Sequence, residues 1–165
     1  MNLTELKEFL DEKSNYYENL DFIESDPVKV PHQFMKKEDI EISAFLTAII
    51  SWGRRKSILK NAFCIMDAMS YQPYDFVMNH TKADLEKLNL INYRTFKSTD
   101  LKFFIRSLKN IYKNFNGLET IFKGEGKSKN LQKEIHKLKS IFFTIPHEKR
   151  SEKHISDPMK GSAAK

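Results

Sequence analysis

The sequence has few of the features that would place it outside the reducing interior of a cell. Cys64 is the only cysteine, so no internal disulfide can form, and it lies in an apolar helical pattern where a thiol usually acts as a small hydrophobe. The longest apolar run, residues 44 to 50, is much shorter than the roughly 20 residues that cross a bilayer. The N-terminus mixes charged with apolar residues, unlike a secretory signal. We therefore expect a cytoplasmic protein without a membrane partner.

Motifs that carry the common kinds of enzyme chemistry are also missing. The sequence has no nucleophile elbow, phosphate-binding loop, His-Glu-x-x-His pair or cysteine-based metal site. Its five histidines lack the mutual helical spacing that suits a metal ion. Neighbouring carboxylates such as Glu38 and Asp39 fall at the start of a predicted helix, where negative charge complements the helix dipole. The residues alone thus predict no catalytic centre, no metal site and no cofactor.

Bulky apolar residues are plentiful, and the charge is segregated along the sequence. The 13 Phe and 6 Tyr supply groups for a core, which argues against disorder of the whole chain. Residues 123 to 165 contain 11 basic and 5 acidic residues and account for the whole net charge of +6. A segregated basic surface suits a phosphate backbone, although solvated Lys-rich helix faces would give the same composition.

Apolar residues at intervals of three and four predict helices along most of the chain. The first helix begins with a capping box of Asn2 and Glu5 and runs to about residue 17. Residues 26 to 32 contain two prolines and are expected to form an extended connector. The helix from Asp39 to Ser51 is apolar nearly all round, which is typical of a helix buried at the centre of its domain.

The second half of the chain shows the same helical pattern with clear start signals. Pro73 and the pair of Thr81 and Asp84 mark the starts of two short helices. Ser98 or Thr99 is expected to cap a longer, clearly amphipathic helix over residues 101–115. Two further helices are predicted over residues 118–122 and 131–142. No segment alternates as a strand does, so the predicted fold class is all-α, a multi-helix orthogonal bundle round the central helix.

We divide the chain into a helical domain of residues 1 to 147 and a polar linker of residues 148 to 165 that ends with the start of a further helix. Ser162 is placed to cap that helix, because Ser followed by Ala-Ala-Lys is typical of a helix N-terminus. Since the sequence stops there, at Lys165, we expect the fold to be truncated. A truncated bundle would expose apolar surface and promote self-association.

The turn at residues 51–56 is the one local constellation that favours a binding function. Gly53 is expected to end the central helix as a left-handed cap, and three cations then open the next helix, where the dipole disfavours them. A bound phosphate would explain that placement, with backbone amides as donors and Trp52 as a stacking face. The alternative, Trp52 in the core and merely solvated cations, stays open. The candidate nucleic-acid contacts are Ser51, Trp52, Gly53, Arg54, Arg55 and Lys56.

Several segments carry a resemblance to a known family. The main one is the run Asp-Ile-Glu-Ile-Ser-Ala-Phe-Leu-Thr-Ala-Ile-Ile-Ser-Trp-Gly-Arg-Arg-Lys at residues 39–56. The supporting matches are Asp26-Pro27, Pro31-His32-Gln33-Phe34, Pro73-Tyr74-Asp75-Phe76, Tyr93-Arg94-Thr95-Phe96, His154-Ile155-Ser156-Asp157-Pro158 and Gly161-Ser162-Ala163-Ala164-Lys165. In this order they resemble a bacterial family of uncharacterised proteins, domain of unknown function 2400. Members of that family are longer, so the resemblance implies further helices with a helix-hairpin-helix-like region.

More distantly, the central helix and its turn are similar to the part of endonuclease III-like DNA glycosylases that leads into a DNA-inserting loop. This similarity implies a DNA-binding protein related to helix-hairpin-helix glycosylases, with duplex DNA as partner and with Ser162 and Lys165 as further contacts. In those enzymes a Lys or Asp beyond the hairpin acts on a flipped base. That segment is not in this sequence, so no catalytic residue is assigned. The alternative is a non-catalytic helical module that binds RNA or another protein.

Overall fold

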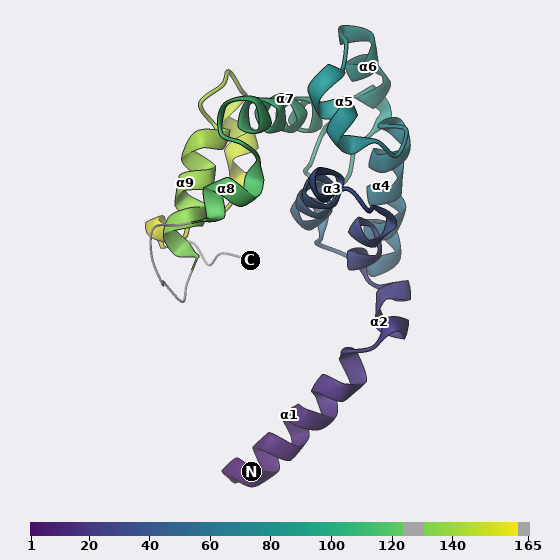
Figure 1. Ribbon diagram of the computed structural model, residues 1–165, viewed down its shortest axis with the longest axis vertical. Coiled ribbons are helices and arrows are strands. Elements are labelled where there is room, and N and C mark those ends of the chain that lie inside the picture. The colour runs from purple at the N-terminus through teal and green to yellow at the C-terminus, as the bar shows by residue number, and fades with distance from the viewer. Residues whose placement is uncertain (124–130, 162–165) are drawn as a thin grey trace.

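Figure 1 shows the computed structural model, which describes residues 1–123 and 131–161. Every regular element in these two ranges is a helix, and they contain no β-strand, only an isolated bridge between Tyr93 and Phe96. The longer helices are α1 (Leu3–Tyr17), α3 (Lys37–Ile50), α4 (Arg55–Ala68), α7 (Ser98–Asn114) and α9 (Gln132–Phe142). The shorter α-helices are α2 (Leu20–Ser25), α5 (Pro73–Asn79), α6 (Lys82–Lys87) and α8 (Leu118–Phe122). The 3-10 helices are η1 (Pro27–Lys29), η2 (Pro31–Gln33), η3 (Leu88–Leu90), η4 (Lys149–His154) and η5 (Pro158–Lys160). The prediction of an all-α protein is confirmed.

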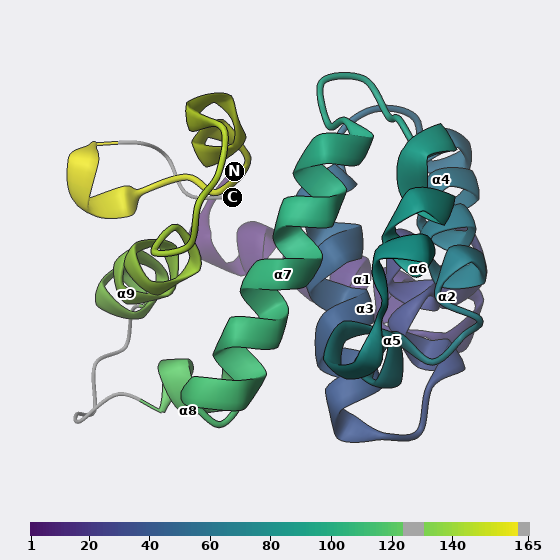
Figure 2. The ribbon, with the colours of Figure 1, turned by 90° about the horizontal axis from the view of Figure 1, so that it is seen from above.

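The helices form two groups that α7 joins. In Figure 1, α7 runs across the upper part of the molecule, with α3 to α6 at one end and α8, α9 and the C-terminal turns at the other. Figure 2 shows the same arrangement from above, with α7 between α9 and the group of α3, α4 and α5. Helix α1 projects away from this body, and none of its residues is buried. Among the described helices, none is long and apolar enough to cross a membrane.

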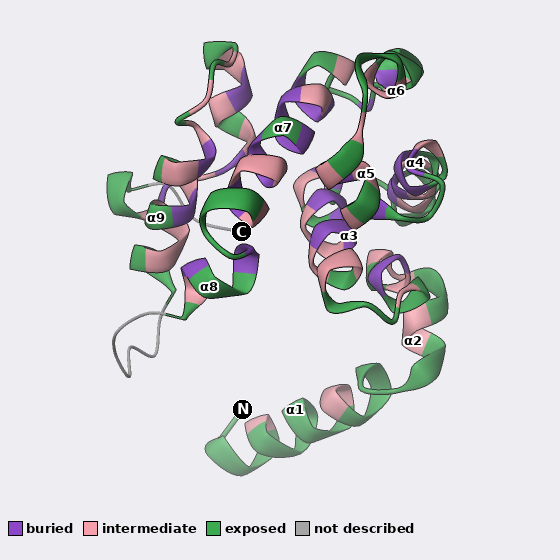
Figure 3. Ribbon diagram, turned by 45° about the horizontal axis from the view of Figure 1, so that its top comes forward, coloured by how far each residue is buried: buried purple, intermediate pink, exposed green. Residues whose placement is uncertain are grey.

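Helices α3, α4 and α7 all contribute buried residues to the core (Figure 3). On α3, Ile42, Leu46 and Ile50 are fully buried at intervals of four, as one face of a helix requires. This helix contributes to the core as expected, although Ala48 on its other side is exposed. Helix α9 joins the core through aromatic contact, with the Phe142 ring 4.7 Å from that of Phe104 on α7.

Local start signals were predicted well where the residues involved are close in sequence. The structure confirms the capping boxes of Asn2 with Glu5 and of Thr81 with Asp84. It also confirms Pro73 as the first residue of its helix, where the missing N–H costs nothing. The expected extended connector at residues 26–32 is wrong, because the chain there forms the 3-10 helices η1 and η2.

The start of α7 also differs from the prediction. Neither Ser98 nor Thr99 caps it, because the helix begins at Ser98 itself and Lys97 is the residue before the first turn. The carboxylate of Asp100 accepts a hydrogen bond from the Lys97 backbone N–H, with 2.8 Å between nitrogen and Oδ2. Asp100, a buried acid in the first turn, thus satisfies the backbone donor of the residue that precedes the helix, as the acid of a capping box does.

Asp100 also fixes the C-terminal segment against α7. Ser151 Oγ donates to its Oδ1 at 2.6 Å, and Arg150 Nη1 donates to its Oδ2 at 2.9 Å. Nε2 of His154 lies 3.3 Å from Oδ2 without the alignment of a hydrogen bond. Residues 149–154 therefore form a helix held on the body by a buried charge. The domain boundary at residue 147 stays a prediction, and the helix expected at the very end of the chain lies outside the described residues.

Candidate nucleic-acid interface

The turn between α3 and α4 has a geometry that the sequence did not fully predict. Helix α3 ends at Ile50 and its C-terminal cap residue is Ser51, whose hydroxyl donates to the Thr47 carbonyl at 2.7 Å. The prediction that Gly53 caps this helix is wrong, because Gly53 lies two residues past the cap. Its φ of +128° is nevertheless a conformation that favours glycine. Arg54 is the residue before the first turn of α4, so the two helices are joined by a very short link.

The turn packs against the loop that precedes α7. Both the Tyr93 hydroxyl and Nη1 of Arg94 donate to the carbonyl oxygen of Trp52, at 3.0 and 3.3 Å respectively. A Cβ on Gly53 would lie 2.7 Å from each of these two donor atoms. A glycine is therefore required at position 53 for two reasons, the positive backbone angle φ and the close approach of the loop that contains Tyr93 and Arg94.

Trp52 is half-buried in this turn rather than lying in the core. The guanidinium carbon of Arg94 lies 5.7 Å from the centre of its ring, within the range of a cation–π contact. The indole also lines a cavity of about 330 Å³ between α3 and the C-terminal segment, together with Phe45, Ile49 and His154. The ring thus has a cation beside it and an apolar cavity next to it.

The cations at the start of α4 differ from one another in their surroundings. Arg55 Nε lies 3.8 Å from Asp26 Oδ2, and its guanidinium lies 5.4 Å from the ring of Phe22. Arg54 and Lys56 are exposed and have no ion-pair partner among the described residues. The first turn of α4 contains no acidic residue and no side-chain cap. Its backbone N–H groups and its dipole therefore favour an anion at this end.

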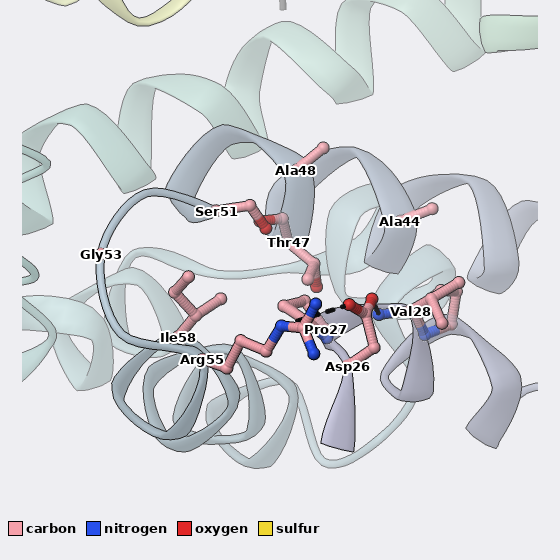
Figure 4. A pocket seen from close by; sticks show the side chains of 11 residues that line it. Asp26, Pro27, Val28, Ala44, Thr47, Ala48, Ser51, Gly53, Arg55 and Ile58 are labelled. Atoms are coloured by element: carbon pink, nitrogen blue, oxygen red, sulfur yellow. Dashed lines mark hydrogen bonds and ion pairs between the residues drawn. The ribbon is translucent and has the colours of Figure 1, made fainter. Parts of the chain in front are cut away.

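A cavity of about 610 Å³ opens beside the same turn, between η1, α3 and the start of α4 (Figure 4). Its polar side chains are those of Asp26, Thr47, Ser51 and Arg55. Its apolar walls are formed by Pro27, Val28, Pro31, Ala44, Ala48 and Ile58, with Gly53 at the turn. Thr47 points from α3 toward the ion pair of Asp26 and Arg55 in Figure 4. In the two described ranges, no group of three or more His, Cys, Asp or Glu side chains could hold a metal ion.

Comparison with known proteins identifies a family for most of the chain. Residues 26–165 match the sequence model of a family described as a protein of unknown function, DUF2400. The chain belongs to this family. The DUF2400 match begins at Asp26, so α1 and α2 lie outside it, whereas the turn, its cavity and the loop of Arg94 lie within it. No curated protein and no solved structure matches the chain.

Most of the residues predicted to contact nucleic acid lie close together in the structure, and Arg94 lies beside them. Residues 51–56 lie together at the turn and the start of α4, and all but the half-buried Trp52 are exposed, whereas Ser162 and Lys165 lie outside the described residues. Arg94 was not predicted as a contact, although it stands in a segment that carries the DUF2400 resemblance. It has a left-handed backbone, with φ of +54°, in an irregular loop. Nothing in its local pattern indicates that the loop reaches Trp52, 42 residues earlier in the chain.

Proposed function

We propose that this protein binds nucleic acid through the turn between α3 and α4, with the phosphate backbone held at the start of α4. The observation that carries the proposal is the pair of exposed, unpaired cations, Arg54 and Lys56, at a helix start without a cap. Arg94 adds a third positive charge from the neighbouring loop, beside the ring of Trp52. Two cations at the turn, a third from the neighbouring loop and an uncapped helix start match the charge and hydrogen-bonding needs of phosphate groups.

Positive side chains at a helix N-terminus are unfavourable by roughly 0.3–1 kcal/mol each, because the dipole places partial positive charge there. Asp26 relieves this for Arg55 only. A bound phosphate would reverse the sign for Arg54 and Lys56, since the anion attracts both the side chains and the N–H groups. Such contacts position a strand without reading its sequence.

Duplex DNA is the partner that we propose. This choice rests on the distant resemblance to endonuclease III-like DNA glycosylases that the sequence of the central helix and its turn suggests. A relative of those enzymes should bind a duplex with an abasic site more tightly than an intact one, because an unpaired position is easier to distort. An RNA- or protein-binding module would show no such preference. No catalytic step is proposed for this chain.

The salt dependence of DNA binding tests the turn directly. The double variant Arg54→Ser with Lys56→Ser should lower the slope of log K against log salt by about 0.9 for each lost phosphate contact on a duplex. The matched variant Lys133→Ser with Lys137→Ser removes the same charge from exposed positions of α9. It should leave the slope nearly unchanged. Fluorescence anisotropy of a labelled duplex at several salt concentrations measures all three proteins.

Two outcomes would contradict the proposal. If both double variants lower the slope equally, binding depends on net charge and not on the turn. If only the α9 variant lowers it, the basic C-terminal half is the docking surface. Neither double substitution should reduce stability, because all four lysine and arginine side chains are exposed and lack ion-pair partners within the described ranges.

A further inference from the structure

A row of positive side chains runs along one side of α7. With 3.6 residues per turn, positions 102, 106, 109 and 113 fall within about 60° of one another round the helix, and the row spans about 16 Å of its length. All four positions hold cations, which we call the α7 cation face: Lys102, Arg106, Lys109 and Lys113. Figure 2 shows α7 in full view along its length, and no other helix lies in front of it.

The last three cations of this face are unpaired. Arg106 and Lys113 are exposed and Lys109 is half-buried, and none of them has an ion pair or a hydrogen bond in the part of the chain that the structure describes. The acid of α7 itself, Asp100, is fully buried and accepts its hydrogen bonds from the C-terminal segment. In α1 and α6, by contrast, a lysine pairs with an acid three or four positions away on the same helix.

Glu86 and Glu148 bring negative charge only to the first turn of the α7 cation face. Oε1 of Glu86 lies 3.2 Å from Nζ of Lys102, which is therefore paired. Glu148 lines a cavity of about 180 Å³ with Lys102 and Arg106, and its Oε2 lies 3.9 Å from Nη1 of Arg150. Within the described ranges, neither acid forms an ion pair with the last three cations of the face.

This arrangement of charge is unfavourable in the protein alone. Cations three and four residues apart on a helix repel each other and destabilise it. The helix dipole favours a cation only in the last turn, which accounts for Lys113 but not for Arg106 or Lys109. An extended polyanion would reverse the sign, because each of its charges attracts the cations beside it. One strand of a duplex carries a phosphate about every 3.4 Å along the axis, so the face spans roughly five phosphates.

We propose that the α7 cation face is a second phosphate-binding surface, which holds the nucleic-acid backbone beyond the segment bound at the turn. The loop before α7 connects the two surfaces, because Nη1 of Arg94 donates to the Trp52 carbonyl oxygen at 3.3 Å. Lys97 is exposed in the same loop, directly before the first residue of α7. Cations thus lead from the turn, through this loop, to the far end of α7. This inference rests on the proposed function and adds a second contact surface to it.

The salt dependence of binding to a labelled duplex tests this surface in the full chain. The triple variant Arg106→Gln with Lys109→Gln and Lys113→Gln removes the three unpaired charges and keeps a good helix former at each position. It should lower the slope of log K against log salt by up to about 2.7, which is about 0.9 for each lost phosphate contact. Its melting temperature should not fall, because the three side chains have no partner to lose in the described residues.

A matched triple variant controls for the loss of net charge. Lys82→Gln with Lys133→Gln and Lys137→Gln removes three charges from exposed positions of α6 and α9. These lysines also lack ion-pair partners in the described ranges, so the control should melt as the parent does. It should leave the salt slope nearly unchanged.

Acetylation of lysine amines locates the contact without any substitution. In the parent protein, saturating duplex should slow the acetylation of Lys109 and Lys113 severalfold, as mass spectrometry of the digested protein measures it. The exposed Lys133 and Lys137 of α9 should react at the same rate with and without duplex. A general effect of the polyanion on the reagent would slow all four lysines alike.

Three results would overturn the inference. The α7 variant could keep the slope of the parent, or both triple variants could lower it equally. Acetylation of Lys109 and Lys113 could proceed at the same rate with and without duplex. These two lysines could instead become protected without duplex as the protein concentration rises, and the acidic α1 of a second copy would then be what covers the face.

The same measurements separate this inference from the proposed function. If the α7 variant keeps the slope while Arg54→Ser with Lys56→Ser lowers it, the α7 surface is wrong and the phosphate site at the turn stands. If only the α7 variant lowers the slope, α7 is the docking surface and the proposed site at the turn is wrong.

Discussion

Replacing Gly53 by alanine should destabilise the protein more than a single added methyl group suggests. The φ of +128° is far from the conformations that alanine prefers, which costs about 1–3 kcal/mol. The new Cβ would also lie 2.7 Å from the Tyr93 hydroxyl and from Nη1 of Arg94. Arg94 can move at small cost because its end is flexible, but Tyr93 is buried and its ring has little freedom.

The expected size of the effect follows from these terms. Displacing Tyr93 weakens its hydrogen bond to the Trp52 carbonyl, a loss of about 1 kcal/mol. Alanine also lowers the conformational entropy of the unfolded chain, which stabilises the folded protein by about 0.4–1 kcal/mol and offsets part of this loss. The net loss for Gly53→Ala is therefore about 2 kcal/mol. For a chain of this size that corresponds to a melting temperature about 4–8 °C lower.

Gly161→Ala is the matched control for this substitution. Gly161 also has a positive φ, of +72°, but a Cβ there would meet no atom within 4 Å. Thermal melts of both variants, followed by circular dichroism, separate backbone strain from the close contact. The fluorescence of Trp52, the single tryptophan, reports on the turn itself. If Gly53→Ala melts no lower than Gly161→Ala, the contact of the turn with Tyr93 contributes nothing and our account of Gly53 is wrong.

Two further predictions concern buried polar groups. Burial lowers the pKa of His154, and the nearby Asp100 carboxylate offsets only part of this shift, so the folded protein favours the neutral imidazole. The free energy of unfolding should therefore fall as the pH drops below about 6.5, the ordinary pKa of histidine. Urea unfolding midpoints should be lower at pH 5.5 than at pH 7.5, and His154→Gln should reduce that difference; an equal difference in the variant would contradict the assignment. Tyr112→Phe should cost about 1.5 kcal/mol, because the Tyr112 hydroxyl donates to Oε2 of Glu41 at 2.7 Å in a part-buried site. A melting temperature within 1 °C of the parent, against the expected fall of about 3–6 °C, would show that water replaces this bond.

The parts of the fold that could be predicted from sequence are those fixed by neighbouring residues. A capping box needs two side chains three positions apart, so Asn2 with Glu5 and Thr81 with Asp84 identify their helix starts without any knowledge of the rest. The stripe on α7 was equally clear, because a helix that buries one side repeats its apolar residues every three or four positions. These signals established an all-helical chain and the place of most helices.

The parts that could not be predicted depend on residues that meet only in the folded chain. Asp100 stands in a first helical turn, where an acid is common, yet it accepts hydrogen bonds from Arg150 and Ser151 some fifty residues later. Burial alone would raise the pKa of Asp100, but its hydrogen bonds from Ser151 and the Lys97 N–H and the nearby Arg150 guanidinium hold this pKa below its usual range. No local pattern indicates that a polar segment near the C-terminus will supply these partners.

Residues 51–56 of the candidate site combine a feature that neighbouring residues determine with one that depends on the folded chain. The sequence places three cations at one helix start and predicts an unfavourable interaction with the dipole for all three. In the folded chain the three cations differ, because Asp26 forms an ion pair with Arg55 only. Arg54 and Lys56 are exposed without an ion-pair partner among the described residues. Asp26 also forms one wall of the cavity that contains the unpaired Thr47 hydroxyl. Arg55 is thus held at the boundary between this cavity and two exposed cations, an arrangement that depends on Asp26 and that the order of residues 51–56 alone does not show.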